Sequence, residues 1–307
     1  MRHINSGLSG KEGKALIANN QDGLRQDDLF VSNSIISVQD AFKYKARKGY
    51  EKVIISNDKI VNIVSDSYGH LPNIDFFGQM ENKLLENNIS TLTRSFNKDD
   101  RSFKAEYILN DDKYQVSVKD IKDNNGNIIK SDLVRPLISL INSYDGSCKT
   151  TASFGYYRVV CQNGLHICKT NLGFSTKHSS NIIQIVMPEL DAIINNFMSN
   201  EFFDIKKKFE VLAETPIKDM KKYVKFICKE TGIFKFEKSD KNSDPSKNAN
   251  DVMDIILKES KYFNAIPNLF NGYNAFNETL HKNMQKEFSK ANEFDLALFD
   301  ATMEYAN

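Results

Sequence analysis

The chain has no tryptophan, only six prolines and four cysteines among 307 residues, and no long apolar run. A membrane helix needs about 20 consecutive, mostly apolar residues, so we expect no membrane association. The polar opening MRHINSGLSGKEGKALIANN lacks the apolar core of a signal peptide, which predicts a cytoplasmic protein. The cysteines form no CxxC pair and are too few for a secreted disulfide scaffold, so free thiols are expected.

The motifs of common cofactor and metal sites are also missing. The chain contains neither the glycine fingerprint of dinucleotide sites nor a P-loop, and it has no HxH or HExxH spacing. Cys161, His166 and Cys168 lie close together in the sequence, but a metal site needs more ligands than these three. We therefore expect no cofactor and no metal ion.

Charge of either sign is not in excess. Forty-one basic residues oppose forty acidic ones, so the net charge is +1. The total gives no argument for nucleic acid, but a local basic patch stays open as an alternative because binding depends on how charge is distributed.

Closely spaced turns between short alternating strands dominate the first half of the chain. Residues 53–56 and 60–65 flank the turn dipeptide Asn57-Asp58 and predict a hairpin. Alternation continues over residues 103–109 and 114–118, and further turns are expected at residues 124–126 and 144–146. The final strands are predicted at residues 137–142, 147–153 and 156–161. Such spacing favours an antiparallel meander over parallel βαβ units.

Helical periodicity appears on both sides of this region. Residues 37–50, with Ser37 as N-cap, and residues 76–88 predict two early helices. Thr215-Pro216 is typical of a helix start and precedes a lysine-rich amphipathic segment. Two or three helices close the chain.

The predicted fold class is α+β, an antiparallel β-sheet meander with packed helices followed by a helical C-terminal part. We divide the chain into five segments. They are an N-terminal arm (1–30), an α+β sheet domain (31–186), a helical segment (187–235), an exposed linker or loop (236–250) and C-terminal helices that pack on the core (251–307).

Basic and aromatic residues recur along the predicted sheet. Aromatic rings beside cations are a physical route to single-stranded DNA, because bases stack on rings while phosphates meet the charges. The alternative is that the rings fill the core and the cations face solvent. The candidate contacts are Arg94, Arg101, Lys104, Lys149, Tyr156, Tyr157 and Arg158.

Polar residues gather around the third turn and at the end of the last strand. Cys161 with His166 and Asp145 has the residue types of a thiol nucleophile triad, although a cysteine in a strand more often packs as a small hydrophobe. Arg158 at the end of an apolar strand is typical of a buried structural pair, for which Asp145 is the expected partner. Asn163-Gly164 predicts a left-handed turn or a helix entry.

Several of these residues fall in motifs that resemble the phage- and plasmid-borne family called domain of unknown function 932 (DUF932). The motifs are NSYDGS (142–147), in which the family usually has His in place of Tyr144, RVVCQNGL (158–165), VSDSY (64–68) with Asn73 and Phe76, HSS (178–180), and NAFNE (274–278) with His281.

The resemblance implies a protein of phages and mobile elements, and thus DNA metabolism. A sheet that carries helices is also similar to phage annealing proteins at the level of fold analogy. The first hypothesis is a phage-type DNA-binding protein that forms a homo-oligomer and acts on single strands in recombination or replication. The second is an enzyme that uses a polar cluster of motif residues, namely Asn142, Asp145, Arg158, Gln162, Asn163 and His178. The third is an interaction or inhibitory protein that binds a host component.

Overall fold

The computed structural model describes residues 29–122, 128–158, 163–166, 173–197, 201–239, 242–263, 265–283 and 288–306. The turn expected at residues 124–126, and the candidate residues Cys161 and Gln162, lie outside these ranges.

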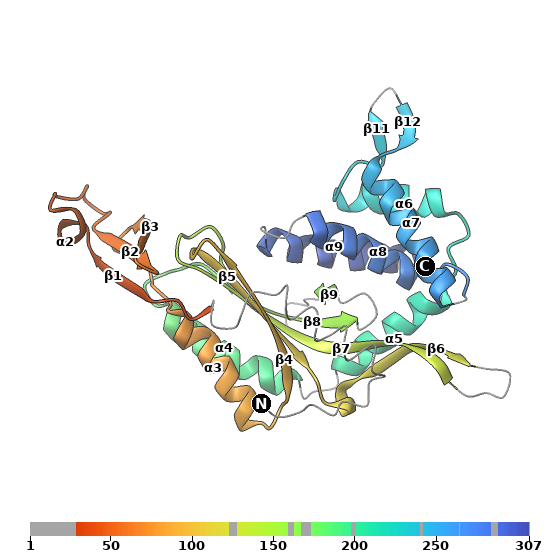
Figure 1. The fold of residues 1–307 in the computed structure, drawn as a ribbon, viewed down its shortest axis with the longest axis horizontal. Helices are drawn as coiled ribbons and strands as arrows, with labels where there is room; N and C mark the ends of the chain where they lie inside the picture. Colours follow the sequence, from red (N-terminus) through yellow and green to blue (C-terminus); the bar gives the residue numbers. More distant parts are fainter. Residues whose placement is uncertain are drawn as a thin grey trace. The chain divides into compact units, whose positions relative to one another are not determined.

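The described chain consists mainly of strands in its first half, with α-helices only at α2 and α3, and is mainly helical in its second (Figure 1). The strands are β1 (Asn33–Ser37), β2 (Lys52–Ser56), β3 (Lys59–Val64), β4 (Thr91–Lys98), β5 (Ser102–Leu109), β6 (Val116–Lys122), β7 (Ile128–Ser143), β8 (Thr150–Arg158), β9 (Asn163–His166), β10 (Phe174–Thr176), β11 (Glu237–Ser239) and β12 (Asn242–Pro245). The helices are α2 (Val38–Phe42), α3 (Asn73–Glu86), α4 (Ile182–Phe197), α5 (Glu201–Glu214), α6 (Met220–Thr231), α7 (Lys247–Tyr262), α8 (Leu269–Asn283) and α9 (Phe288–Ala306), with a 3-10 turn, η2, at Asp112–Tyr114.

Three sheets organise the strands. The largest has the order β10-β8-β7-β5-β4, with β6 also paired to β7 and β9 to β8. A second sheet has the order β1-β2-β3, and the third is the hairpin of β11 and β12. The pairings of β1 with β2, β2 with β3, β6 with β7 and β8 with β9 are antiparallel. The predicted α+β class with a helical C-terminal part is confirmed.

Two compact units share the chain, and both are discontinuous in sequence. Unit 1 comprises Met1–Tyr107, Ser139–Ala152 and Ser175–Leu190. Unit 2 comprises Ile108–Ile138, Ser153–Phe174 and Asp191–Asn307. In unit 1, α3 buries Phe76, Phe77 and Met80. In unit 2, α8 lies beside α9 (Figure 1), and residues 269–277 of α8 are all buried.

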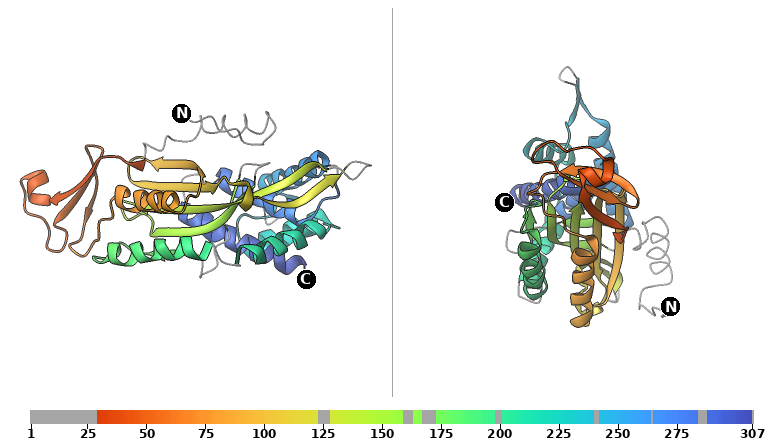
Figure 2. Two further views of the ribbon diagram at one scale, coloured as in Figure 1. Left: turned by 90° about the horizontal axis from the view of Figure 1, so that it is seen from below. Right: turned by 90° about the vertical axis from the view of Figure 1, so that its left-hand side faces the viewer.

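The β1-β2-β3 sheet shows how local signals set structure. Asn57 and Asp58 adopt positive φ angles of 49° and 60°, as the predicted two-residue hairpin requires. Ser37 caps α2 by accepting a hydrogen bond from the Asp40 backbone N–H at 3.0 Å, also as predicted. The helix, however, ends at Phe42 because Lys43 takes a left-handed conformation. The prediction of a helix over residues 37–50 is therefore wrong beyond its first turn, and α2 with the following loop lies at the outer end of the small sheet (Figure 2).

The central strands are longer than their sequence patterns indicated. Residues 137–142 form only the last part of the 16-residue β7, and the two strands expected over residues 147–161 are largely one strand, β8. All eight residues of β5 are buried, although alternation predicted one solvated face. Asn163-Gly164 lies within β9 and pairs with Arg158 and Tyr157, so the predicted turn or helix entry is wrong.

The predicted helix start at Thr215-Pro216 is also wrong. The Ile217 backbone N–H donates to Pro267 O, and the Leu269 backbone N–H donates to Thr215 O, so this segment pairs with distant backbone. Helix α6 begins at Met220 instead, where the Asp219 side chain accepts from the Lys222 backbone N–H. The segment 236–250, predicted as a loop or linker, contains β11, β12 and the Ser246 cap of α7.

Candidate functional site

Three motif segments that are far apart in the sequence meet in unit 1. Asn142, at the end of β7, is fully buried, and its side-chain amide donates to Leu71 O at 2.9 Å and to Asn73 Oδ1 at 2.8 Å. The Thr150 hydroxyl lies within hydrogen-bond distance of both Asn142 Oδ1 and His178 Nε2, at 3.3 and 3.2 Å. The buried amide thus joins the segment that begins α3 to the start of β8.

His178 completes this cluster from the HSS segment. Its Nδ1 lies 3.1 Å from Gly69 O, and because a carbonyl only accepts, Nδ1 carries the proton. The imidazole stacks on Tyr68 with 4.9 Å between the ring centroids and 7° between the planes. Burial lowers the pKa of His178, so the ring is neutral near pH 7.

Tyr144 lies in the NSYDGS motif, at the position where the family that this motif resembles usually has His. Its hydroxyl accepts a hydrogen bond from the Asn73 backbone N–H at 2.9 Å, which satisfies a donor in the first turn of α3. The ring packs against His70 and Phe103, and burial raises the pKa of its hydroxyl. Tyr144 is therefore a structural anchor of the cluster and stays protonated.

Asp145 shapes the turn that follows Tyr144. Its Oδ1 accepts from the Ser147 backbone N–H at 2.9 Å, and its backbone oxygen accepts from the Asn62 amide at 2.8 Å. Arg101 Nε lies 4.0 Å from Asp145 Oδ2. These contacts are those of a tight turn held to its surroundings.

A second cluster in unit 2 is centred on Arg158. The guanidinium is fully buried and donates to both carboxylate oxygens of Asp132, at 2.7 and 2.5 Å, and to Glu259 Oε1 at 2.7 Å. It also lies over the Phe270 ring at 5.1 Å. The expected pairing of Arg158 with Asp145 is wrong, because the two carboxylates that neutralise it come from β7 and α7.

Further motif residues lie on α8. Asp295 on α9 accepts hydrogen bonds from Asn277 Nδ2 at 2.6 Å and from His281 Nε2 at 2.8 Å. Asn274 donates to Phe270 O at 2.6 Å. Burial, together with the nearby Glu259 carboxylate, raises the pKa of Glu278. The NAFNE segment with His281 therefore fastens α8 to α9 and adds a carboxyl group near Arg158.

Comparison with protein families agrees with these motifs. A family model described as "Domain of unknown function (DUF932)" matches residues 61–296. The chain belongs to the DUF932 family. No curated protein and no solved structure matches the chain.

The DUF932 motifs thus form two clusters, one in each unit. The unit 1 cluster contains Asn142, Asp145 and His178 of the predicted polar cluster, whereas Arg158 belongs to unit 2. Asn163 contributes its backbone to β9 beside Arg158. Most polar side-chain atoms of these two clusters are paired within their own cluster, as in a structural network.

The seven predicted DNA contacts divide by exposure. Tyr156, Tyr157 and Arg158 are at most 2% exposed, so none offers a surface for a base or a phosphate. Lys104 is buried with its ammonium 2.7 Å from Glu106 Oε1. The two tyrosines follow the alternative, in which the rings fill the core, whereas the two cations are buried and face neither DNA nor solvent.

The other three are accessible to different degrees. Arg94 is one-third exposed and lies 3.4 Å from Glu106 Oε2, and Arg101 is 43% exposed and lies 3.3 Å from Asp99 Oδ2. Lys149 is exposed in the connection between β7 and β8. Their role in DNA contact stays a prediction.

Exposed aromatic rings beside cations, which we expected on the sheet, occur instead in a segment that was predicted to be helical. Residues 42–50, FKYKARKGY, are called here the 42–50 loop. Tyr44 is 77% exposed, Tyr50 51% and Phe42 39%. Four exposed cations lie between these rings, and the segment contains no acidic residue. They are Lys43, Lys45, Arg47 and Lys48. The run of rings and cations is visible in the sequence, but only the structure shows that these rings are exposed, because residues 43–50 do not form the expected helix.

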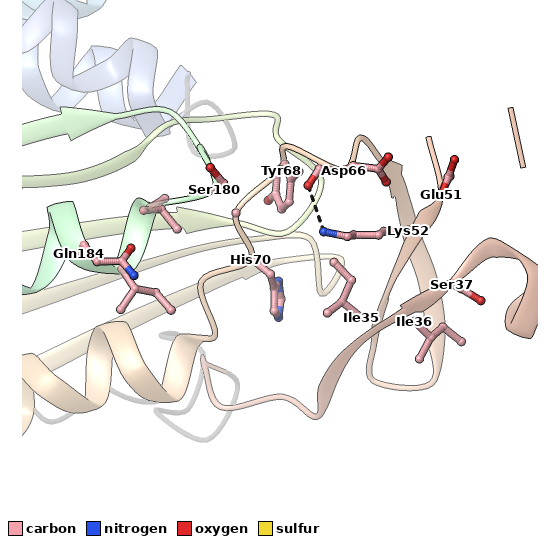
Figure 3. A pocket seen from close by; sticks show the side chains of 13 residues that line it. Ile35, Ile36, Ser37, Glu51, Lys52, Asp66, Tyr68, His70, Ser180 and Gln184 are labelled. Atoms are coloured by element: carbon pink, nitrogen blue, oxygen red, sulfur yellow. Dashed lines mark hydrogen bonds between the residues drawn. The ribbon is translucent and has the colours of Figure 1, made fainter. Parts of the chain in front are cut away.

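A pocket of about 540 Å³ lies beside the motif cluster of unit 1, which contains Asn142 and His178 (Figure 3). Its apolar lining includes Ile35 and Ile36 from β1 and Ile182 and Ile183 from α4. Its polar lining is Ser37, Glu51, Lys52, Asp66, Tyr68, Gly69, His70, Ser180 and Gln184.

The part of the chain that the structure describes has neither a cluster of metal ligands nor a membrane-spanning helix. No group of three or more His, Cys, Asp or Glu side chains there has the geometry to hold a metal ion. Among the same residues, no helix combines the length and apolar character needed to cross a membrane. Cys148 and Cys228 are free thiols.

Proposed function

We propose that the chain binds single-stranded nucleic acid through the 42–50 loop, and that the strand is DNA in the phage-type setting that the family resemblance implies. The observation that carries the proposal is the alternation of exposed rings with exposed cations in this loop. Stacking on an aromatic ring contributes about 1–3 kcal/mol per base and tolerates any sequence, while neighbouring cations follow the phosphates.

The local geometry supports this use of the loop. Arg47 lies over the Tyr50 ring, with its guanidinium carbon 6.0 Å from the ring centroid, so cation and ring are already adjacent. Tyr44 is more exposed than any other aromatic side chain among the described residues. The loop also lies outside the matched family region, which begins at residue 61.

A second basic surface exists on α6. Lys221 and Lys222 are exposed, but Lys225 is paired with Glu237 at 2.8 Å and Lys229 lies 3.4 Å from Glu230. Of the two aromatic residues on this helix, Tyr223 is buried and Phe226 is half-buried. A lysine face over an apolar seam is typical of a solvated helix, so the 42–50 loop is the better candidate.

The test is fluorescence anisotropy with labelled oligo-dT at two salt concentrations. For single strands, the logarithm of the binding constant falls by about 0.7 per phosphate contact for each tenfold rise in salt. If all four loop cations contact phosphates, raising salt from 50 to 200 mM lowers affinity about 50-fold. Replacing Lys43, Lys45 and Lys48 by Gln leaves one cation, and the same step then lowers affinity about 3-fold.

A matched control keeps the charge change constant. Lys247, Lys258 and Lys261 on α7 are also exposed, so their triple replacement by Gln removes the same charge elsewhere. Tyr44→Ala should weaken binding by about 1–3 kcal/mol, whereas Tyr262→Ala, at a site 53% exposed on α7, should not. Equal losses from the loop and α7 variants would contradict the proposal. So would binding to anionic phosphatidylserine vesicles without binding to oligonucleotides, because exposed rings with cations also suit a lipid surface.

The two other functional hypotheses have less support. An enzyme built on Asp145, Arg158 and Asn163 needs an accessible Arg158, and its guanidinium is fully buried and paired. No observation on the described residues favours a host protein as the partner over a nucleic acid.

A further inference from the structure

The pocket in unit 1 lies at the base of the 42–50 loop. Glu51 and Lys52, which line it, directly follow Tyr50, and Ser37, which also lines it, caps the helix that leads into the loop. A strand whose bases stack on the loop would therefore run close to the mouth of the pocket.

The size and walls of the pocket suit a flat heterocycle. Its volume of about 540 Å³ falls within the range of about 300–1,000 Å³ usual for small-molecule sites. Isoleucine side chains from β1 and α4 line it, and Figure 3 shows the imidazole of His70 between Gln184 and Ile35. Apolar walls with a few polar groups are the usual composition of a ligand site.

Three of the polar lining residues offer hydrogen-bond acceptors, namely His70, Glu51 and Asp66. His70 Nε2 lies 2.8 Å from Asn33 Oδ1, and because that oxygen accepts, Nε2 carries the proton and Nδ1 presents a lone pair. This Nδ1 is buried and has no hydrogen-bond partner among the described residues. The lining carboxylates Glu51 and Asp66 add further acceptors. Carboxylates accept hydrogen bonds from the exocyclic amine of a base such as cytosine.

Among the residues that the structure describes, Lys52 is the one cation that lines the pocket. Its ammonium donates to Asp66 O at 3.0 Å, which uses one of its three donors. The other two can point toward a phosphate at the mouth, so the pocket offers complementary groups for both parts of a nucleotide.

We propose that this pocket binds a single nucleotide whose base carries an exocyclic amino group, taken from the strand held by the 42–50 loop. The inference rests on the proposed function, which supplies the strand, and adds a base-specific site to sequence-tolerant stacking.

The experiment titrates dCMP and dTMP separately into the protein by isothermal calorimetry. We expect dCMP to bind more tightly than dTMP, because thymine has a carbonyl where cytosine has its amine. Ile183→Trp, at a site 41% exposed, should weaken dCMP binding by about tenfold or more, since the indole occupies volume that the base needs. Ile74→Trp on α3, 61% exposed and outside the pocket, is the matched control and should bind dCMP normally.

Failure of this inference differs from failure of the proposed function. Oligo-dT binding that depends on the loop cations, together with no nucleotide binding or equal binding of dCMP and dTMP, overturns the pocket and keeps the loop. An unchanged dCMP affinity in Ile183→Trp overturns it too. Conversely, dCMP binding that Ile183→Trp abolishes, without oligonucleotide binding at the loop, supports a nucleotide site and refutes the loop. Photo-crosslinking of an oligonucleotide with one 5-iodocytosine base, which keeps the exocyclic amine, adds a direct readout, and crosslinks at residues 66–70 would support the pocket.

Discussion

Replacing Arg158 by Met should strongly destabilise unit 2. The guanidinium has no exposed surface, and the side chains of its partners Asp132 and Glu259 are only 4% and 11% exposed. Methionine preserves much of the apolar volume, but it leaves two carboxylates without their cation. Removing one partner of a buried ion pair costs about 3–5 kcal/mol, because the remaining charge is uncompensated. We expect a loss in this range in the free energy of unfolding.

Urea denaturation followed by circular dichroism measures this loss. Arg101→Met is the matched control, because Arg101 is 43% exposed and its partner Asp99 is 69% exposed. Such a surface pair contributes about 0–1 kcal/mol. A second variant, with Asp132→Asn and Glu259→Gln added to Arg158→Met, removes the orphaned charges and should recover part of the lost stability.

The result decides between two roles for a residue of the RVVC motif. If Arg158→Met unfolds as the native protein does and instead loses oligonucleotide binding, the argument from burial fails and Arg158 is a contact residue. If stability falls and the triple variant recovers it, the guanidinium is a structural cation that holds β7, β8 and α7 together.

Three further predictions concern unit 1 and are measured by urea denaturation. A Cβ at Gly69 would lie 1.8 Å from Ser179 O, so Gly69→Ala should lower the free energy of unfolding by about 1–3 kcal/mol or more. The control is Gly78→Ala on α3, where the new Cβ would meet only Ile74 Cδ1 at 3.7 Å; this variant should raise the free energy of unfolding by about 1 kcal/mol. An unchanged Gly69→Ala would contradict the close approach of the two backbones. Tyr144→Phe should lower the free energy of unfolding by about 1–3 kcal/mol, because the buried Asn73 N–H loses its acceptor. Tyr44→Phe is the control and should leave the free energy of unfolding unchanged. Equal values for both variants would refute the role of the Tyr144 hydroxyl as that acceptor. Burial and the neighbouring His178 lower the pKa of His70 from 6.5 to about 4, so at acidic pH the unfolded chain binds this proton more readily than the folded one. The free energy of unfolding should therefore fall as the pH drops from 7 to 5, and it should fall less in His70→Gln. The same fall in both proteins would refute the lowered pKa of His70.

Local signals predicted those parts of the fold that depend on neighbouring residues. The Asn57-Asp58 hairpin and the Ser37 cap are correct because turn and cap geometry depends on side chains within three residues. The antiparallel meander followed from the spacing of such turns. The Thr215-Pro216 start failed because residues 267 and 269 pair with this backbone, and no local pattern announces a partner some 50 residues away.

The candidate sites show the same division. The motifs placed the chain in its family, but they did not reveal that Asn142 meets Asn73 and His178, which are brought together only by packing. Tyr156 and Tyr44 are the same residue type in basic, aromatic surroundings, yet one is 1% exposed and the other 77%. Exposure is a property of what covers a side chain, so composition cannot assign it.

The sequence by itself determined the α+β class, the hairpin turns, the family and the absence of common cofactor motifs, since each is written in short-range patterns of residues. Only the tertiary structure decided which charges are buried and which rings are free. Arg158 can be buried as a cation because the fold brings to it the carboxylates of Asp132 and Glu259, which lie 26 and 101 residues away in the sequence. The 42–50 loop is the candidate nucleic-acid surface because no segment of unit 1 that the structure describes covers its rings.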